Sequence, residues 1–101
     1  GKVLNVLAMV VLKHLNWVSK SRFRPVKANL ELISHRLKTG VTISDFYALN
    51  SYMCKKWSQD VEMSKYIRPK TIYSARNFEQ YLGELKTNQL KWKQNNEMSK
   101  M

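Results

Sequence analysis

The first part of the chain repeats apolar positions with the period of an α-helix. Between Val3 and Val18 there is no glycine or proline, and apolar residues recur at positions 4, 7, 8, 11, 12, 15 and 18. Val6, Met9 and Val10 are also apolar but lie off that stripe. A helix that is apolar on two sides needs a second covering surface, so we expect this one either to be central in the core or to contact a partner.

A second, shorter helix is predicted over residues 26–38. Leu30, Ile33 and Leu37 recur on one face at helical spacing. Gly40 follows, and a glycine can adopt the left-handed conformation that ends many helices. This helix is therefore expected to be amphipathic and to end just before Gly40.

A third helix is predicted from Thr42 to about Ser58. Thr42 is followed three residues later by Asp45, a capping-box pair that favours a helix start. The apolar stripe of this helix consists of Ile43, Phe46, Tyr47, Met53, Cys54 and Trp57. Asn50 interrupts the stripe, and we expect it to be a hydrogen-bonded polar group at the edge of the core.

Two Arg-Pro pairs, Arg24-Pro25 and Arg68-Pro69, each precede a run with a helical pattern. A proline at the first helical position has its φ preset and loses no needed N–H, so both pairs predict helix starts. The second pair is expected to open a short helical turn through Tyr73. Residues 58–71 otherwise lack the helical period and are predicted to be an ordered connector. Its large apolar residues should fold it onto the core, namely Met63, Tyr66 and Ile67.

The last long helix is predicted from Asn77, taken as the N-cap, with Gln80 three residues on. Its apolar stripe and continuation contain Phe78, Tyr81, Leu82, Leu85, Gln89 and Trp92. We therefore predict a single all-α domain over residues 1–93, a small helical bundle of about four main helices plus a short helical turn. Residues 94–101 are predicted to be a disordered tail.

Charge and cysteine content narrow the function classes. The 101 residues contain 18 Lys and Arg but only 7 Asp and Glu, a formal net charge of +11 that favours an acidic partner, nucleic acid first and an acidic protein surface second. Cys54 is the single cysteine, so a disulfide-stapled secreted fold is excluded and a reducing cytosol is expected. The apolar run Val3–Leu12 is shorter than the roughly 20 residues that span a bilayer, so no membrane association is expected.

No pattern for catalysis or metal binding stands out. His14, His35 and Cys54 fall on three different predicted helices, and no glycine-rich phosphate loop is present. We therefore expect a protein that is not an enzyme and that holds no metal or cofactor. Sequence-specific DNA reading is disfavoured, because Asp45 stands near the start of the third helix, where recognition helices contact bases.

The connector between the first two helices has the densest positive charge. It is either a solvated loop beside a helix start or an electropositive patch for phosphate or carboxylate groups. Its cations are Lys20, Arg22, Arg24 and Lys27, with no acid before Glu31.

A longer pattern resembles the conserved C-terminal domain of phage replication proteins, the replisome-organiser type of phages of Gram-positive bacteria. The resemblance covers roughly Val11 to Glu84. Its motifs are, in chain order, Phe23-Arg24-Pro25, Ala28-Asn29-Leu30, Arg36-Leu37, Gly40, Asp45-Phe46, Trp57, residues 63–71 and residues 78–82. No single helical rule demands this order of aromatics, Arg-Pro pairs and glycine.

The resemblance implies a role in the replication of DNA. In the family, this domain normally follows a separate N-terminal region that recognises the phage origin, and we expect this chain to act without that region. As a stand-alone chain it looks like staphylococcal phage inhibitors that bind the bacterial helicase loader, an AAA+ ATPase. We therefore expect a phage-encoded interaction module in the host bacterial cytoplasm that blocks or diverts initiation of bacterial DNA replication.

Exposed aromatics and arginines dominate binding hot spots, so we expect such residues to form the partner surface. The candidates are Arg22, Arg24, Tyr52, Lys56, Arg68, Tyr73 and Arg76. Two other functions stay open: an accessory DNA-binding domain of a phage replication protein, and a homodimer formed through the apolar N-terminal helix.

Overall fold

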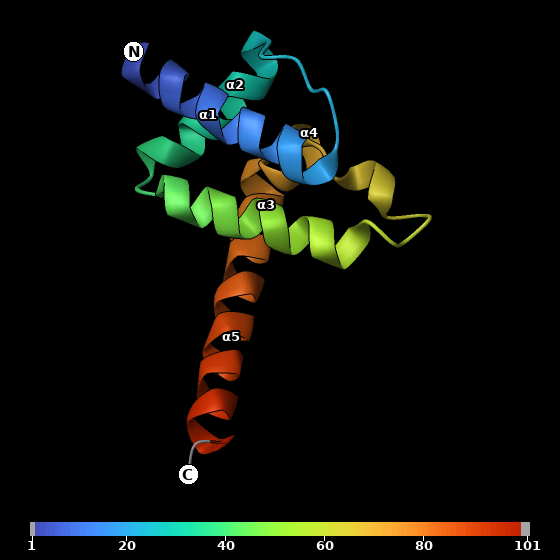
Figure 1. The fold of residues 1–101 in the computed structure, drawn as a ribbon. Helices are drawn as coiled ribbons and strands as arrows, with labels where there is room; N and C mark the ends of the chain where they lie inside the picture. Colours follow the sequence, from blue (N-terminus) through green and yellow to red (C-terminus); the bar gives the residue numbers. More distant parts are fainter. Residues whose placement is uncertain (1, 100–101) are drawn as a thin grey trace.

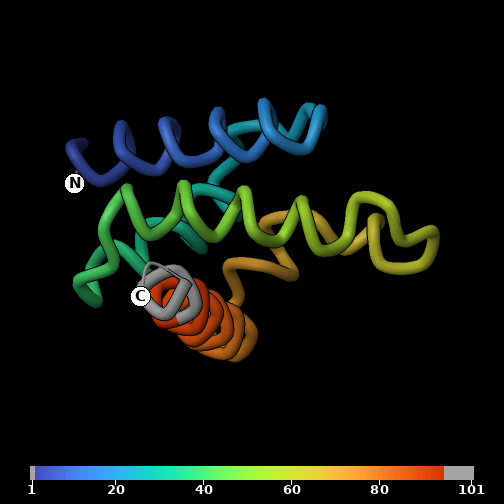
Figure 2. The backbone as a smooth tube through the Cα atoms, turned by 60° about the horizontal axis from the view of Figure 1, so that its bottom comes forward, coloured from blue at the N-terminus to red at the C-terminus, as the bar shows by residue number. Residues whose placement is uncertain are grey.

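The computed structural model describes residues 2–99, with side chains up to Gln94. Helices α1 (Lys2–Ser19) and α3 (Ile43–Trp57) lie side by side in both views, and α2 (Lys27–Lys38) packs against α1 (Figures 1 and 2). The short α4 (Pro69–Ile72) contacts α2, and α5 (Ala75–Ser99) contacts both α3 and α4. The predicted all-α class with four main helices is confirmed, and no strand occurs in residues 2–99.

Helix α5 has two parts with different surroundings. Its first part contacts α3 and α4, whereas its second half projects away from the other helices (Figure 1). Leu85 is the last buried residue on α5 among the side chains described. Beyond Gln94 only helical backbone is described, up to Ser99, and the predicted disordered tail over residues 94–101 stays a prediction. No described helix is long and apolar enough to cross a bilayer.

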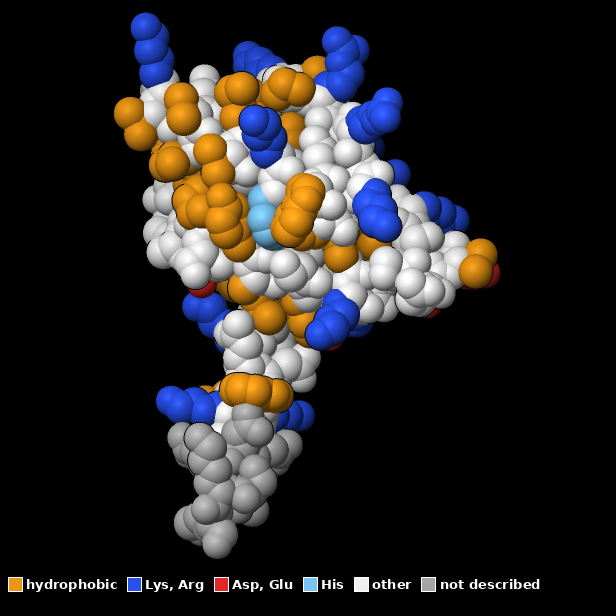
Figure 3. Space-filling model, in the orientation of Figure 1, with side chains coloured by type: hydrophobic (Ala, Val, Ile, Leu, Met, Phe, Trp, Pro, Cys, Tyr) orange, Lys and Arg blue, Asp and Glu red, His pale blue; other side chains and the backbone are white. Residues whose placement is uncertain are grey.

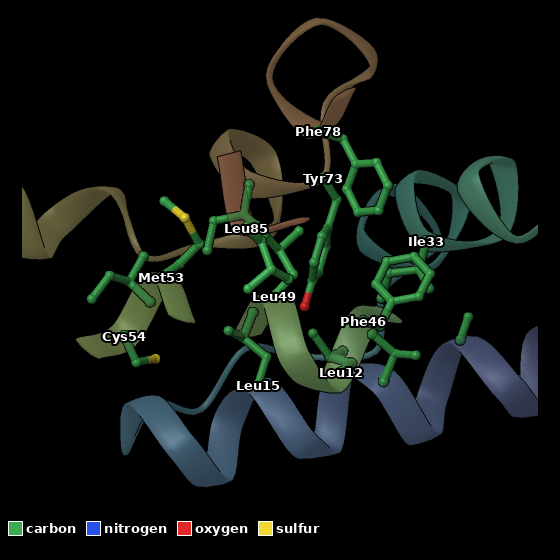
Figure 4. Packing of buried hydrophobic residues seen from close by; sticks show 14 of the residues in the cluster. Leu12, Leu15, Ile33, Phe46, Leu49, Met53, Cys54, Tyr73, Phe78 and Leu85 are labelled. Carbon is green, nitrogen blue, oxygen red and sulfur yellow. The ribbon is translucent and has the colours of Figure 1, made fainter. Parts of the chain in front are cut away.

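The core forms where α1, α2 and α3 meet the segment that joins α4 to α5. Phe46 packs edge-on against Tyr73, with ring centroids 5.4 Å apart, and lies 5.2 Å from Phe78 (Figure 4). The other fully enclosed apolar side chains come from several elements and include Val11, Leu15, Ile33, Leu49, Met53 and Ile72. Burying them supplies most of the free energy that holds so small a domain together.

Local sequence signals set several helix ends as predicted. Thr42 caps α3, since its hydroxyl accepts the Asp45 N–H and the Asp45 carboxylate accepts the Thr42 N–H. After α2 the chain turns at Gly40, whose φ is +97°, a conformation that favours glycine. Pro69 is the first residue of α4, and Ile67 is buried while Met63 and Tyr66 pack against the core, as expected for the connector.

The predicted start of the second helix, at about residue 26, is one residue from that of α2, but the roles predicted for Pro25 and Asn77 at helix starts are wrong. Pro25 lies two residues before α2, and Val26 is the N-cap in an extended conformation. The Asn29 side chain donates to the Arg24 carbonyl, which is 2.9 Å away, so the Pro25 segment stays outside the helix. Helix α5 starts at Ala75 rather than after Asn77, because the Ser74 hydroxyl accepts the Asn77 N–H at 3.3 Å.

Candidate interaction surfaces

Helix α1 presents a second apolar side to solvent, which we call the α1 face. It consists of the exposed residues Val3, Val6, Met9, Val10 and Trp17. In Figure 3, hydrophobic side chains gather over the N-terminal half of α1, with Lys and Arg side chains around them. Trp17 is 78% exposed, which is unusual for so large an apolar side chain. A contiguous apolar patch of this kind indicates an interaction site.

A groove runs between the α1 face and the connector that follows α1. The Asn16 side chain accepts the Phe23 N–H at 2.8 Å and donates to the Phe23 carbonyl at 3.0 Å, so it fixes the connector against α1. The resulting groove has a volume of about 460 Å³, and its lining is mostly apolar. Its walls are formed by Val6, Met9, Val10, Leu12, Lys13, Asn16, Phe23 and Pro25.

The end of α1 places the basic connector beside this groove. Lys20 has a φ of +56°, and the Ser21 N–H donates to the Asn16 carbonyl at 2.9 Å, which closes the last turn and reverses the chain. Arg22 and Arg24 then flank Phe23 on the exposed side. The lining of the groove is therefore mostly apolar with one charged residue, Lys13, and the exposed Arg22 and Arg24 adjoin its wall residues Phe23 and Pro25 along the chain.

Three cations of this region, Lys13, Arg22 and Arg24, form no salt bridge among the described side chains. Helix α1 contains no Asp or Glu, and the next acid along the chain is Glu31. The salt bridges among the described side chains of the whole domain join Lys27 to Glu31, Lys56 to Glu84 and Lys86 to Asp45. None of these pairs includes Lys13, Arg22 or Arg24, so their charge is available to a partner.

A cluster of polar side chains lies where α3 crosses α5. Glu84 accepts hydrogen bonds from Lys56 at 2.7 Å and from the Tyr52 hydroxyl at 3.0 Å, and Asn88 donates to the Tyr52 hydroxyl at 2.8 Å. The bond from Lys56 lowers the pKa of Glu84, and the same bond raises the pKa of Lys56. Burial, with the bond to Glu84, raises the pKa of Tyr52. These contacts tie α5 to α3.

Beyond this cluster, toward the C-terminus, the projecting half of α5 carries its own exposed apolar residues. Trp92 is 69% exposed and Leu90 is also exposed. A wide depression of about 840 Å³ lies between α3 and this half of α5. Its lining mixes apolar, amide and basic groups, namely Tyr52, Lys55, Leu85, Asn88, Gln89, Trp92 and Lys93. It is broader and more polar than the α1 groove.

A buried polar chain links three parts of the fold beneath the α1 face. The Tyr73 hydroxyl donates to the Asn50 side-chain oxygen, and the Asn50 amide nitrogen lies 3.1 Å from Nδ1 of His14. This assigns the Asn50 nitrogen as donor, so Nδ1 of His14 accepts and carries no proton. His14 stacks on Tyr47 at 4.2 Å between ring centroids, and burial lowers its pKa.

The structure distributes the predicted partner residues over separate places. Arg22 and Arg24 are exposed in the connector on either side of Phe23, while Tyr52 and Lys56 belong to the cluster between α3 and α5. Arg68 is exposed, donates to the Thr71 hydroxyl at 2.9 Å and lies over the Tyr66 ring. Arg76 is exposed on the first turn of α5.

Tyr73 requires a correction. Its side chain is fully buried and its hydroxyl is bonded to Asn50, so it cannot contact a partner in this fold. Asn50 is likewise fully buried rather than at the edge of the core. The predicted partner residues did not include Val6, Val10 or Trp17, although Val6 and Val10 were recognised as apolar positions off the main stripe of α1.

The fold and its surfaces define a small all-α domain with an exposed apolar helix face and a basic rim. The chain belongs to the conserved phage C-terminus family, which matches residues 11–83. The predicted resemblance to a conserved phage C-terminal domain is therefore confirmed. The matched range, residues 11–83, is nearly the same as the range of the sequence motifs, roughly Val11 to Glu84. No significant match exists among the curated proteins or the solved structures.

Proposed function

We propose that this phage protein is a non-enzymatic interaction module that binds the AAA+ domain of the host's replicative-helicase loader in the bacterial cytoplasm. By occupying a surface that the loader needs for nucleotide, a neighbouring subunit or single-stranded DNA, it blocks or diverts initiation of host DNA replication. The family supports a phage protein, and the resemblance to replisome organisers supports the replication target.

The observation that carries the proposal is the α1 face with its groove. A monomer gains nothing from exposing several large apolar side chains along one helix, whereas a docked partner would remove them from water at about 25 cal/mol per Å². Trp17 and the exposed arginines of the connector that follows α1 are the residue types that carry most of the energy in protein interfaces.

Three of the side chains that could perform chemistry, His14, Tyr73 and Cys54, are committed to the fold. His14 and Tyr73 both bond to Asn50. Cys54 is buried, and burial raises the pKa of its thiol, which is the opposite of a reactive thiolate. This supports a binding rather than a catalytic role.

The test uses two tryptophans of similar exposure as a matched pair. Purified loader is titrated with the nuclease-treated chain by calorimetry. Trp17→Ala is expected to weaken binding at least tenfold, about 1.4 kcal/mol, and Trp92→Ala is expected to leave it within twofold. The absence of binding between the wild-type chain and the loader would refute the proposed target.

The high net charge favours one alternative, an accessory DNA-binding domain. Such binding would rest on displaced counterions, so the affinity for an oligonucleotide would fall steeply between 50 and 200 mM salt, following the general behaviour of protein contacts to phosphate. Tight, salt-sensitive binding of an oligonucleotide by a chain that ignores the loader would establish this alternative instead.

A further inference from the structure

The α1 face has the spacing of a seam that accepts another helix. Val3, Val6, Val10 and Trp17 are separated by steps of three, four and seven residues, and Lys13 occupies the remaining position of that stripe. Alternating steps of three and four are the pattern by which one helix packs along another. From residue 3 to residue 17 the seam is about 21 Å long at 1.5 Å per residue. It matches a partner helix of about four turns.

We propose that the α1 face binds an acidic amphipathic helix of another protein. The apolar stripe of that helix lies along the groove between α1 and Phe23, and its flanking carboxylates pair with Lys13, Arg22 and Arg24. The inference rests on the proposed function, because it states the chemistry of the segment that the module recognises.

The charge around the seam argues for an acidic partner. Lys13 lies within the seam and also lines the groove, so a docked helix covers part of its side chain. Covering a charged group is costly unless an opposite charge meets it. Arg22 and Arg24 are exposed on either side of the wall residue Phe23 in the chain, and the described side chains hold no acid that pairs with them. A carboxylate on either flank of the partner satisfies these groups.

The same charges disfavour a second copy of this chain. Two chains of net charge +11 repel each other, and α1 brings no acid to the interface. An antiparallel pair centred on Val10 would place Lys13 of one copy against Val6 of the other, which leaves the ammonium group covered and unpaired. A second copy therefore fits the shape of the seam but not its electrostatics.

Nucleic acid fits the seam poorly for a different reason. Single strands bind by stacking successive bases on several aromatic rings along a charged groove. Along the seam, the exposed apolar side chains are aliphatic except for Trp17. Aliphatic side chains offer neither a stacking plane nor a donor to phosphate, whereas they fit the Leu, Ile or Phe side chains of a helix.

A displayed library of random 20-residue peptides tests the inference without any host protein. The wild-type chain is the bait, and Val10→Glu is the counter-selected variant, because it places a carboxylate in the seam. Val61→Glu is the matched control, since Val61 is 93% exposed in the connector before α4, outside the seam. Circular dichroism confirms that each variant keeps its helix content.

The expected peptides carry apolar residues at helical spacing with Glu or Asp beside them. A synthetic copy of the most enriched peptide should lose at least tenfold in affinity for Val10→Glu and less than twofold for Val61→Glu. Lys13→Glu should also weaken it, and a peptide with its flanking acids changed to Lys should recover affinity for that variant. Backbone amide shifts should concentrate at residues 3–17 and 22–25.

Four results would overturn the inference. The first is enrichment of peptides without acids, and the second is an affinity that Val10→Glu does not change. The third is a wild-type dimer in solution that Val10→Glu dissociates, which would make a second copy the occupant. The fourth is a single-stranded oligonucleotide whose binding Val10→Glu abolishes. Because no loader is present, a correct result here with no loader binding would retain the surface and remove only the proposed target.

Discussion

Asn50 shows how one polar residue can organise a core of this size. Its side chain accepts from the Tyr73 hydroxyl on one side and faces Nδ1 of His14 on the other, so α1, α3 and the end of α4 are joined through it. A buried amide without partners would cost about 1–3 kcal/mol, and here both ends are used. The chain specifies one packing of these three segments because other packings would leave the amide unpaired.

This arrangement predicts that stability depends on the protonation of His14. Its pKa in the folded chain is below the ordinary value of 6.5, because burial disfavours the charged ring. The unfolded chain therefore binds the proton more readily between the lowered pKa and 6.5, and the free energy of unfolding should fall as pH is lowered through that window. Urea unfolding at several pH values measures this.

His14→Gln is the control, because glutamine keeps an acceptor for Asn50 but does not titrate in this range. The difference in stability between wild type and variant should be constant above pH 6.5 and should change below it. A difference that stays constant throughout would show that His14 does not sense protonation.

At the scale of elements, the connector after α1 is held in place by side chains rather than by regular structure. Asn16 makes both hydrogen bonds to the backbone of Phe23, in the way one strand residue pairs with another. The Ser19 hydroxyl also bonds back to the Leu15 carbonyl at 2.6 Å. The two Asn16 bonds fix Phe23, which forms one wall of the α1 groove, against α1.

Asn16→Ala is expected to release this wall. The Phe23 N–H and carbonyl lose their partner, which should lower the free energy of unfolding by about 1–2 kcal/mol. Hydrogen exchange at the Phe23 amide should become faster, as measured by NMR. Asn29→Ala removes an exposed bond to Arg24 and serves as the control, with a smaller effect on stability. Unchanged protection of the Phe23 amide would contradict the assigned role.

At the scale of the whole molecule, the core ends partway along α5. Leu85 is almost fully buried, whereas Leu90 is 60% exposed on the projecting half. Apolar contacts therefore join only the first part of this helix to the rest of the domain. Among the described residues, the projecting half buries no apolar side chain, and its link to α3 is the hydrogen bond from Asn88 to Tyr52, so its stability depends mainly on helix propensity.

Two leucine variants on this helix should differ sharply. Leu85→Ala is expected to lower the free energy of unfolding by about 2–5 kcal/mol, because it opens a cavity in the core. Leu90→Ala should change it by no more than about 0.5 kcal/mol, as for an exposed position. Urea denaturation of both variants provides the measurement. A comparable loss for Leu90→Ala would mean that the projecting half packs against the domain.

Much of the architecture could be predicted from the chain because its signals are local. The capping pair of Thr42 and Asp45, the stop at Gly40 and the helical turn from Pro69 all depend on residues a few positions apart. The start of α5 was misplaced because both Ser74 and Asn77 are residue types that cap helices well. In the structure the Ser74 hydroxyl accepts the Asn77 N–H, whereas the Asn77 side chain bonds to the Thr71 carbonyl, at 2.9 Å.

The sequence by itself determined that this protein is helical and basic and that its first helix is apolar on two sides. Periodicity follows from the order of the residues, and net charge follows from their composition. The tertiary structure alone decided which apolar side of α1 is buried, that Tyr73 lies inside the core, and that Phe23 forms a groove with Met9 and Val10. The physical reason is that burial depends on which distant segments cover a residue. Two apolar stripes of one helix are equivalent until α2 and α3 pack against one of them.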